Sequence, residues 1–195
     1  MMPAQVKVSM GDTLKRLQAA IDKKCPDMKM KAGLKAADID ALVKKYGMSI
    51  PEPMKQLYMW HDGSKGPSAG TTARPEHFFT SLEGGFNFLL KVQEMNEALA
   101  DKHKLPEDYY TGYLLPVYGN NSLWLQCDLR RRPEEGAYSM GFPEPFLFCF
   151  FPSLQNALTA IAECYETGAF KVGESKRKNS IHDRNSIIVD GKAWA

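Results

Sequence analysis

Two places in the sequence set a group capable of acid–base or nucleophilic chemistry beside a carboxylate: His61-Asp62 and Cys127-Asp128. A general base needs an oriented partner within hydrogen-bond reach. Neighbouring residues on a helix point about 100° apart, and neighbours on a strand point to opposite faces. Adjacency therefore predicts no catalytic residue. We interpret His61 as a helix-end group that interacts with the helix dipole, Cys127 as a core thiol and Asp128 as a surface carboxylate.

The other cysteines and the basic residues offer no alternative site. The four cysteines form no CxxC pair, and no Cys/His spacing resembles a zinc site. The run of residues 130–132 (three arginines) could bind phosphate, but Glu134 and Glu135 follow at once, which is typical of a solvated hairpin tip. The sequence therefore predicts no metal site, and its net charge of +2 predicts no direct nucleic-acid partner.

The composition is that of a globular protein. Hydrophobic residues make up 44% of the 195 residues and charged residues 25%. The chain has no run of about 18 apolar residues, and its first residues lack the apolar segment of an export signal. Its cysteines lie mostly in apolar runs. We therefore expect a cytoplasmic location and no membrane partner.

The element that would position His61 is a short helix within residues 50–63. Pro53 suits its first turn, because the amide that proline lacks would be unpaired there. Leu57 and Trp60 share one side of the helix, and Gly63 favours a left-handed end. A helix of about two turns is marginal alone in water. We therefore expect Trp60 to be mostly buried against the central or the closing helix.

Four more helices are predicted from polar caps and from apolar residues at helical spacing. Their ranges are 12–25, 37–47, 80–102 and 153–168. Asp12 and Ser153 are the predicted caps of the first and the last helix, and Thr80 with Glu83 forms a capping box for the central one. The central helix would bury Met95 in its later turns.

Beyond Pro106 the apolar residues change from helical spacing to alternation, which is typical of antiparallel strands. The predicted strands are 113–118, 123–129, 138–142 and 146–151. Helices followed by a β-meander and a closing helix define an α+β fold. We divide the chain into a helical extension (1–29), one domain (30–173) and a loosely held tail (174–195), in which residues 187–189 are apolar enough to dock back.

The order of these parts follows a recognisable pattern: a helix that ends in glycine, an Ile-Pro step, a short helix that closes on His-Asp-Gly, then the central helix, meander and closing helix. The residues that carry the pattern are Ile39, Leu42, Tyr46, Gly47, Ile50, Pro51, Leu57, Tyr58, His61, Asp62 and Gly63, then 79–82, 115–116, 119–120, 125–128 and 154–165. The pattern resembles the SUKH superfamily, or Smi–Knr domain family. The resemblance implies a single α+β domain with no cofactor and no established catalytic residues.

Most bacterial members of the superfamily look like immunity proteins, so the resemblance implies a non-enzymatic module that binds a protein toxin, encoded by a neighbouring gene. We expect the partner on the polar face and turns of the meander, where aromatic anchors and charges combine. These residues are Tyr118, Asn120, Trp124, Asp128, Arg130 and Glu144. Two alternatives stay open: a regulatory scaffold resembling the cell-wall-assembly regulator, and a small hydrolase using His61 or Cys127. The oligomeric state stays open too.

Overall fold

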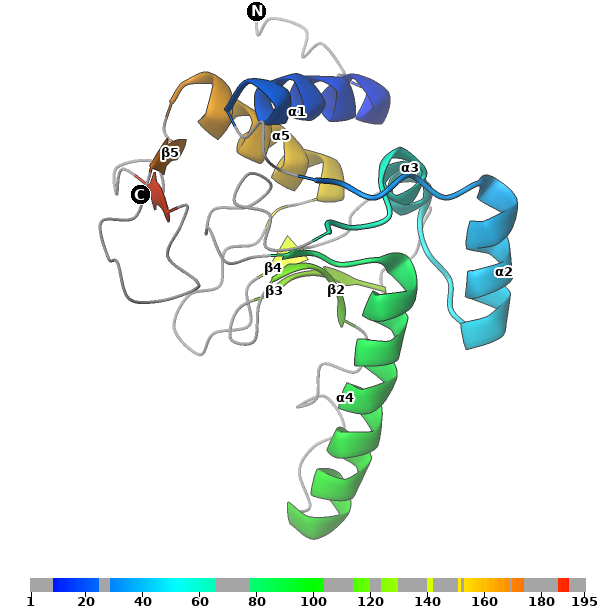
Figure 1. Cartoon of the computed structure of the whole chain (residues 1–195). Helices are drawn as coiled ribbons and strands as arrows, with labels where there is room; N and C mark the ends of the chain where they lie inside the picture. Colours follow the sequence, from blue (N-terminus) through cyan, green and yellow to red (C-terminus); the bar gives the residue numbers. More distant parts are fainter. Residues whose placement is uncertain are drawn as a thin grey trace, which may run out of the picture.

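The computed structural model describes residues 9–24, 29–65, 78–103, 114–119, 124–129, 140–141, 151, 153–168, 170–173 and 186–189. The elements in these ranges are α1 (Met10–Lys24), α2 (Ala36–Tyr46), α3 (Glu52–Trp60), β1 (Phe78–Phe79), α4 (Leu82–His103), β2 (Leu114–Gly119), β3 (Trp124–Asp128), β4 (Met140–Gly141), α5 (Leu154–Glu166), β5 (Phe170–Gly173) and β6 (Ser186–Val189). Figure 1 shows α1 and α5 together above α3, with the sheet below and α2 at one edge. The predicted α+β class is confirmed.

The start of α1 is fixed by Ser9 and not, as predicted, by Asp12. The Asp12 amide donates to Ser9 Oγ at 3.1 Å, and this hydroxyl donates back to the Asp12 carboxylate at 2.6 Å. Asp12 therefore lies three positions after the cap residue Ser9. There its negative charge interacts favourably with the positive end of the helix dipole. The hydroxyl bond also lowers the pKa of Asp12. The apolar face of α1, with Leu14, Leu17 and Ile21, is buried as its spacing predicts.

The helices α2 and α3 follow the local sequence signals closely. Gly47 ends α2 with a left-handed φ of 61°, which glycine adopts without steric cost. In α3, Pro51 is the N-cap and Pro53 lies in the first turn. Gly63 is also left-handed, with φ 87°, but α3 has already ended at His61. A Cβ on Gly63 would lie 2.8 Å from the Ser81 amide nitrogen, so close packing against the start of α4 demands glycine there.

The anchor of α3 in the core is not Trp60. The fully buried residues are Met54, Leu57 and Tyr58, whereas Trp60 is only partly buried. At about 100° per residue, Trp60 lies about 60° round from Leu57, on the side away from Met54 and Tyr58. Its indole packs edge-on against the His61 ring at 4.3 Å and faces Phe79 at 6.4 Å. Trp60 thus packs against the core as expected, but its burial is partial, and the rings that it approaches are those of His61 and Phe79.

The strands β1, β2, β3 and β4 form one antiparallel sheet in that order. A bulge interrupts the β2–β3 register between Pro116 and Tyr118. The sequence predicts that Asp128 faces solvent, but this side chain is only 8% exposed, and Gln126 two residues earlier is only 5% exposed. The prediction of a half-exposed strand is wrong here. An alternating pattern identifies the two faces of a strand but not whether the second face is covered.

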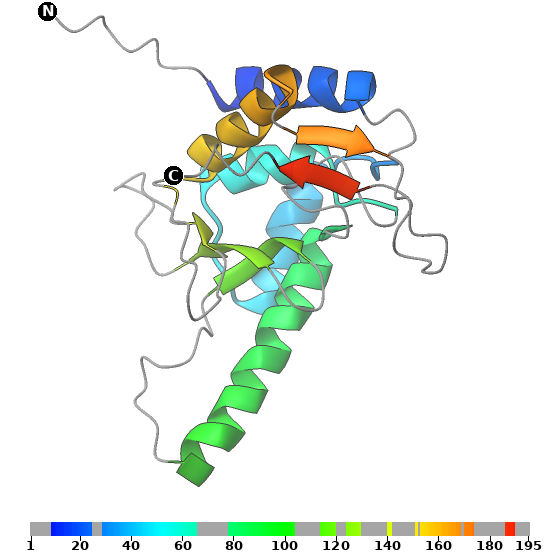
Figure 2. The same ribbon diagram turned by 90° about the vertical axis from the view of Figure 1, so that its left-hand side faces the viewer.

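The helix α4 is tied to the body of the protein at its N-terminal end. Ser81, not Thr80, is the cap, because its Oγ accepts the Gly84 amide at 3.2 Å. A Cβ on Gly85 would lie 3.1 Å from Leu115 Cδ1, so β2 passes close to this turn. Figures 1 and 2 both show the later turns projecting away from the other elements. Met95 is consequently 63% exposed, so its predicted burial is wrong.

The closing helix α5 holds α1 against the domain. Ser153 caps α5 as predicted, with its Oγ accepting the Asn156 amide at 3.1 Å. Arg16 of α1 makes a two-pronged ion pair with Glu166, at 3.0 and 2.6 Å, and the pair lowers the pKa of Glu166. Figure 2 shows α1 lying across α5. The helix predicted as an extension is therefore part of the same core.

Part of the predicted loose tail is paired with the strand that follows α5. Ser186–Val189 form β6, which is antiparallel to β5, with Ile188 opposite Lys171. The apolar patch of the tail docks back at this strand (Figure 2). The expectation of a loosely held tail therefore does not apply to residues 186–189. The predicted hairpin tip at 130–135 and most of the predicted strands 138–142 and 146–151 lie outside the described residues.

Candidate protein-binding surface

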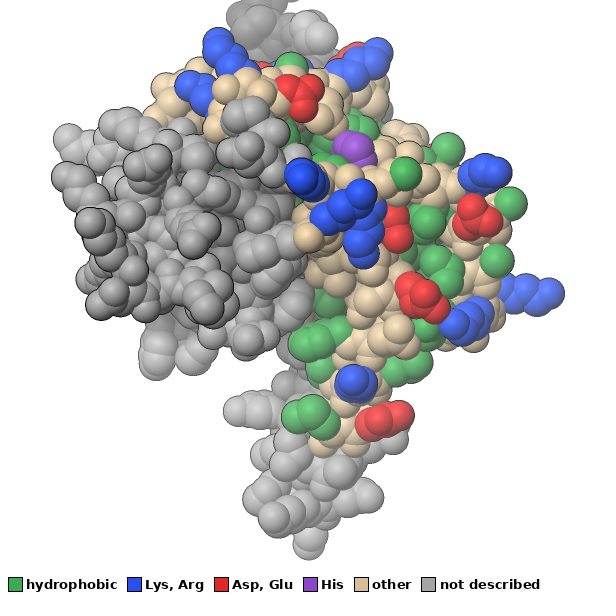
Figure 3. All heavy atoms as spheres, viewed as in Figure 1, with side chains coloured by type: hydrophobic (Ala, Val, Ile, Leu, Met, Phe, Trp, Pro, Cys, Tyr) green, Lys and Arg blue, Asp and Glu red, His purple; other side chains and the backbone are tan. Residues whose placement is uncertain are grey.

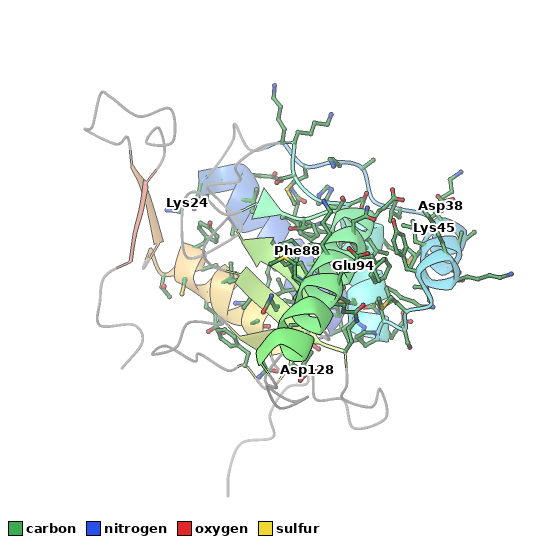
Figure 4. All side chains as sticks on the ribbon, turned by 90° about the horizontal axis from the view of Figure 1, so that it is seen from below. Lys24, Asp38, Lys45, Phe88, Glu94 and Asp128 are labelled. Atoms are coloured by element: carbon green, nitrogen blue, oxygen red, sulfur yellow. The ribbon has the colours of Figure 1, made fainter. Side chains whose placement is uncertain are left out.

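The predicted partner-binding residues do not assemble into one exposed surface in the described part of the chain. Tyr118 is fully buried, and its ring stacks on Phe79 at 4.8 Å. Burial also raises the pKa of the Tyr118 hydroxyl well above its usual value. Asp128 is nearly buried at the end of β3, below α4 in Figure 4. The prediction that Tyr118 and Asp128 lie on an exposed face is therefore wrong.

The other four members of the predicted set remain predictions. Asn120, Arg130 and Glu144 lie outside the described residues, and so does the side chain of Trp124. Their part in binding a partner rests on the sequence alone.

The adjacent residues His61 and Asp62 have separate structural roles. His61 Nδ1 donates to the Lys31 carbonyl oxygen at 2.8 Å, and Nε2 lies 2.9 Å from Gln18 Oε1 on α1. The Asp62 carboxylate accepts the Leu82 amide at 2.9 Å, which satisfies an unpaired N–H at the start of α4. His61 does lie at the predicted end of α3, where its backbone amide donates to the Leu57 carbonyl at 3.1 Å. Its imidazole has a different role from the one predicted, because the ring joins α1 to the domain. Neither side chain orients the other.

We expect His61→Phe to destabilise the protein by about 1–3 kcal/mol, because both hydrogen bonds are lost while the ring contact with Trp60 is kept. Denaturant titration measures the free energy of unfolding. Gln18→Ala, which leaves the bond to Lys31 intact, should cost less. A cost of His61→Phe below about 0.5 kcal/mol would show that these bonds do not hold α1 in place.

The thiol of Cys127 is not poised for nucleophilic chemistry. Cys127 is fully buried in β3. Burial, together with the charge of neighbouring Asp128, raises the pKa of the thiol to about 12. The reactive thiolate is therefore almost absent at neutral pH. Among the described residues, no group of three or more His, Cys, Asp or Glu side chains could hold a metal ion.

An open groove lies between α1 and α3, which the sequence did not indicate. Its volume is about 430 Å³, and it is lined by Gly11, Leu14, Lys15, Gln18, Gln56, Met59 and Trp60. Met59 is 48% exposed and lies in the wall of the groove beside Trp60. Gln18, in the wall of the groove, also lies within hydrogen-bond distance of His61 Nε2. The shape of the groove therefore depends on this contact, which holds α1 in place. We call this feature the α1–α3 groove.

The protein has an α+β fold with a mainly apolar groove on its surface. Its described residues form no catalytic group. Residues 33–154 match the model of the SMI1 / KNR4 family (SUKH-1). The chain therefore belongs to this family, as the order of its elements suggested. No curated protein matches the chain. None of the described helices is long and apolar enough to cross a membrane.

The matched region begins after α1 and ends at the first residue of α5. The α1–α3 groove therefore combines a helix inside the family domain with a helix outside it. Sequence reasoning missed the groove because α1 and α3 are distant in the sequence. The one available signal was Met59, an apolar residue off the predicted apolar side of α3.

Proposed function

We propose that this chain is a non-enzymatic binding protein of the cytoplasm that neutralises a protein toxin by direct binding. The observation that carries the proposal is the α1–α3 groove, where Met59 is exposed beside Trp60. Exposed apolar and aromatic side chains in a concave site are typical anchors of protein interfaces. Family membership supports the same role, since most bacterial members look like immunity proteins.

The side chains with catalytic potential also favour binding over hydrolysis. Both ring nitrogens of His61 have structural partners, and the Cys127 thiol is buried and protonated. A hydrolase that used either one would have to break the link between α1 and the domain, or expose β3. Stoichiometric binding needs no such change.

The proposal is tested by co-expression with the product of the adjacent gene. Cells should survive only when this chain is present, and the two proteins should co-purify as a complex. Protection needs tight binding, and nanomolar affinity corresponds to about −12 kcal/mol. A neighbouring product that is harmless and binds nothing would contradict the toxin partner and favour a regulatory scaffold.

Met59→Glu should weaken the complex about 30-fold or more if Met59 is a central anchor, because a charge cannot be buried in the interface without a partner. Met95→Glu is the matched control, since Met95 is the other large apolar residue among those described that is strongly exposed, and it lies on the projecting part of α4. Both variants should unfold at the same denaturant concentration as the unmodified protein. Equal binding by the two variants would remove the groove from the interface.

A further inference from the structure

A cluster of positive charge lies on a short two-stranded ladder that joins the segment before α2 to the segment after α3. Met30 and Ser64 are opposite each other in an antiparallel bridge. The Lys31 amide donates to the Gly63 carbonyl at 2.8 Å, and the Lys65 amide donates to the Lys29 carbonyl at 2.8 Å. Lys29 and Lys65 are therefore directly opposite each other.

The three lysines of this ladder point to solvent on the same side. Met30 packs against the core, and the Ser64 hydroxyl accepts the Phe79 amide at 3.2 Å, so these two residues face inward. Side chains alternate along a strand, which places Lys29, Lys31 and Lys65 on the outward side, where all three are exposed. We call these three side chains the basic ladder. Figure 3 shows lysine side chains gathered on this face, beside a histidine.

The basic ladder has no acidic partner within the described part of the chain. The ion pairs there join Arg16 to Glu166, Lys45 to Glu83 and Lys55 to Asp40, and none of them includes a ladder lysine. The carboxylate of nearby Asp62 is engaged at the start of α4. Like charges directly opposite each other on a ladder are unfavourable. The net charge of the whole chain is only +2, so this concentration of positive charge is local.

The basic ladder and the α1–α3 groove are linked through one residue, His61. His61 connects them, because it bonds to the backbone of Lys31 on one side and to Gln18 of the groove on the other. The indole of Trp60 lies against the same histidine at 4.3 Å. Lys15, on the wall of the groove, adds a further positive charge. The apolar groove and the basic ladder are thus joined by the side chain of His61.

We infer that this surface receives an amphipathic acidic segment of the partner protein, with its apolar side chains in the α1–α3 groove and its carboxylates on the basic ladder. The inference rests on the proposed function for the identity of that partner. Charge complementarity selects an acidic ligand. The apolar lining with Leu14 and Met59 favours protein side chains over the phosphates of a nucleic acid, which would leave the groove unfilled.

The chemistry of the surface is tested with a labelled synthetic helix that carries leucines on one face and glutamates on the other. Fluorescence anisotropy on the full chain should show binding, and the binding should weaken as the salt concentration rises from about 0.1 to about 0.5 M. The variant Lys29→Gln/Lys65→Gln should bind about fivefold more weakly. The control Lys44→Gln/Lys91→Gln makes the same change in net charge on α2 and α4 and should bind like the unmodified protein.

Several results would overturn the inference. They are equal binding by the two double variants, stronger binding of a matched helix with lysines in place of glutamates, and binding of a single-stranded oligonucleotide in preference to the acidic helix. The product of the adjacent gene separates this inference from the proposed function. A complex that forms equally well with both double variants would refute the acidic docking surface and leave the proposed function intact. Failure of that product to bind, with ladder-dependent binding of the acidic helix, would support the surface while refuting the toxin partner.

Discussion

Replacing Gly33 with alanine should strongly destabilise the protein, because the added methyl group would clash with the backbone of α3. A Cβ at this position would lie 1.8 Å from the Met59 carbonyl oxygen and 2.5 Å from its carbon. The obstacle is backbone, so no side-chain rotation relieves it. The segment before α2 would have to leave the end of α3 and lose the bond from the Leu34 amide to the Tyr58 carbonyl, now 2.9 Å. We expect a cost above about 3 kcal/mol, measured by denaturant titration.

Gly47→Ala is the matched control for this prediction. Gly47 has a left-handed φ of 61°, but no atom lies within 4 Å of the added methyl group. Alanine there should cost only about 1–2 kcal/mol, the price of the left-handed backbone. A Gly33 variant as stable as the Gly47 variant would mean that residues 29–34 do not pack against α3. The basic ladder would then lose its geometric basis as well.

The second large effect is expected at Leu17, outside the region that matches the family. Leu17 of α1 is fully buried in the core cluster, which also contains the apolar residues of α5. Leu17→Ala removes three carbon atoms from this cluster and leaves a cavity, so the free energy of unfolding should fall by about 2–5 kcal/mol. Thermal unfolding followed by circular dichroism gives the shift in Tm.

Lys23→Ala is the control on the same helix. Lys23 is exposed, and substitutions at such positions usually change stability by less than about 0.5 kcal/mol. If Leu17→Ala were as mild as Lys23→Ala, α1 would be an independent extension, as the sequence suggested, and not a layer of the core.

The helices could be predicted because their signals are local. Gly47 and Ser153 mark helix ends by their own backbone and side-chain chemistry, and both predictions are confirmed. The caps of α1 and α4 differ from those that the sequence predicts. Ser9 and Ser81 hold the capping positions, whereas the sequence predicts Asp12 and Thr80. Several polar residues near a helix start can cap it, and the first buried turn decides which one does.

The candidate site could not be predicted because its parts meet only in three dimensions. Lys29 and Lys65 are far apart in the sequence, in segments without the β-branched residues that mark strands. The same holds for the link from His61 to Gln18, which spans 43 residues. Figure 4 shows how widely the charged side chains are spread, with Lys24 on α1 and Lys45 on α2 on opposite sides of α4. The sequence could identify His61 as unusual, but not its partners.

The docking of α1 on α5 has a consequence for the order in which the protein folds during synthesis. Thr13 on α1 contacts Thr159 on α5 at 3.3 Å, across 146 positions of the chain. At about 5–20 residues per second, the ribosome needs roughly 7–30 s to make the residues between these helices. For that time the face of α1 that α5 covers has no docking site, although α3 and the link from His61 to Gln18 can already hold the helix. The complete core, with α1 packed on α5, therefore forms only once α5 has left the ribosome.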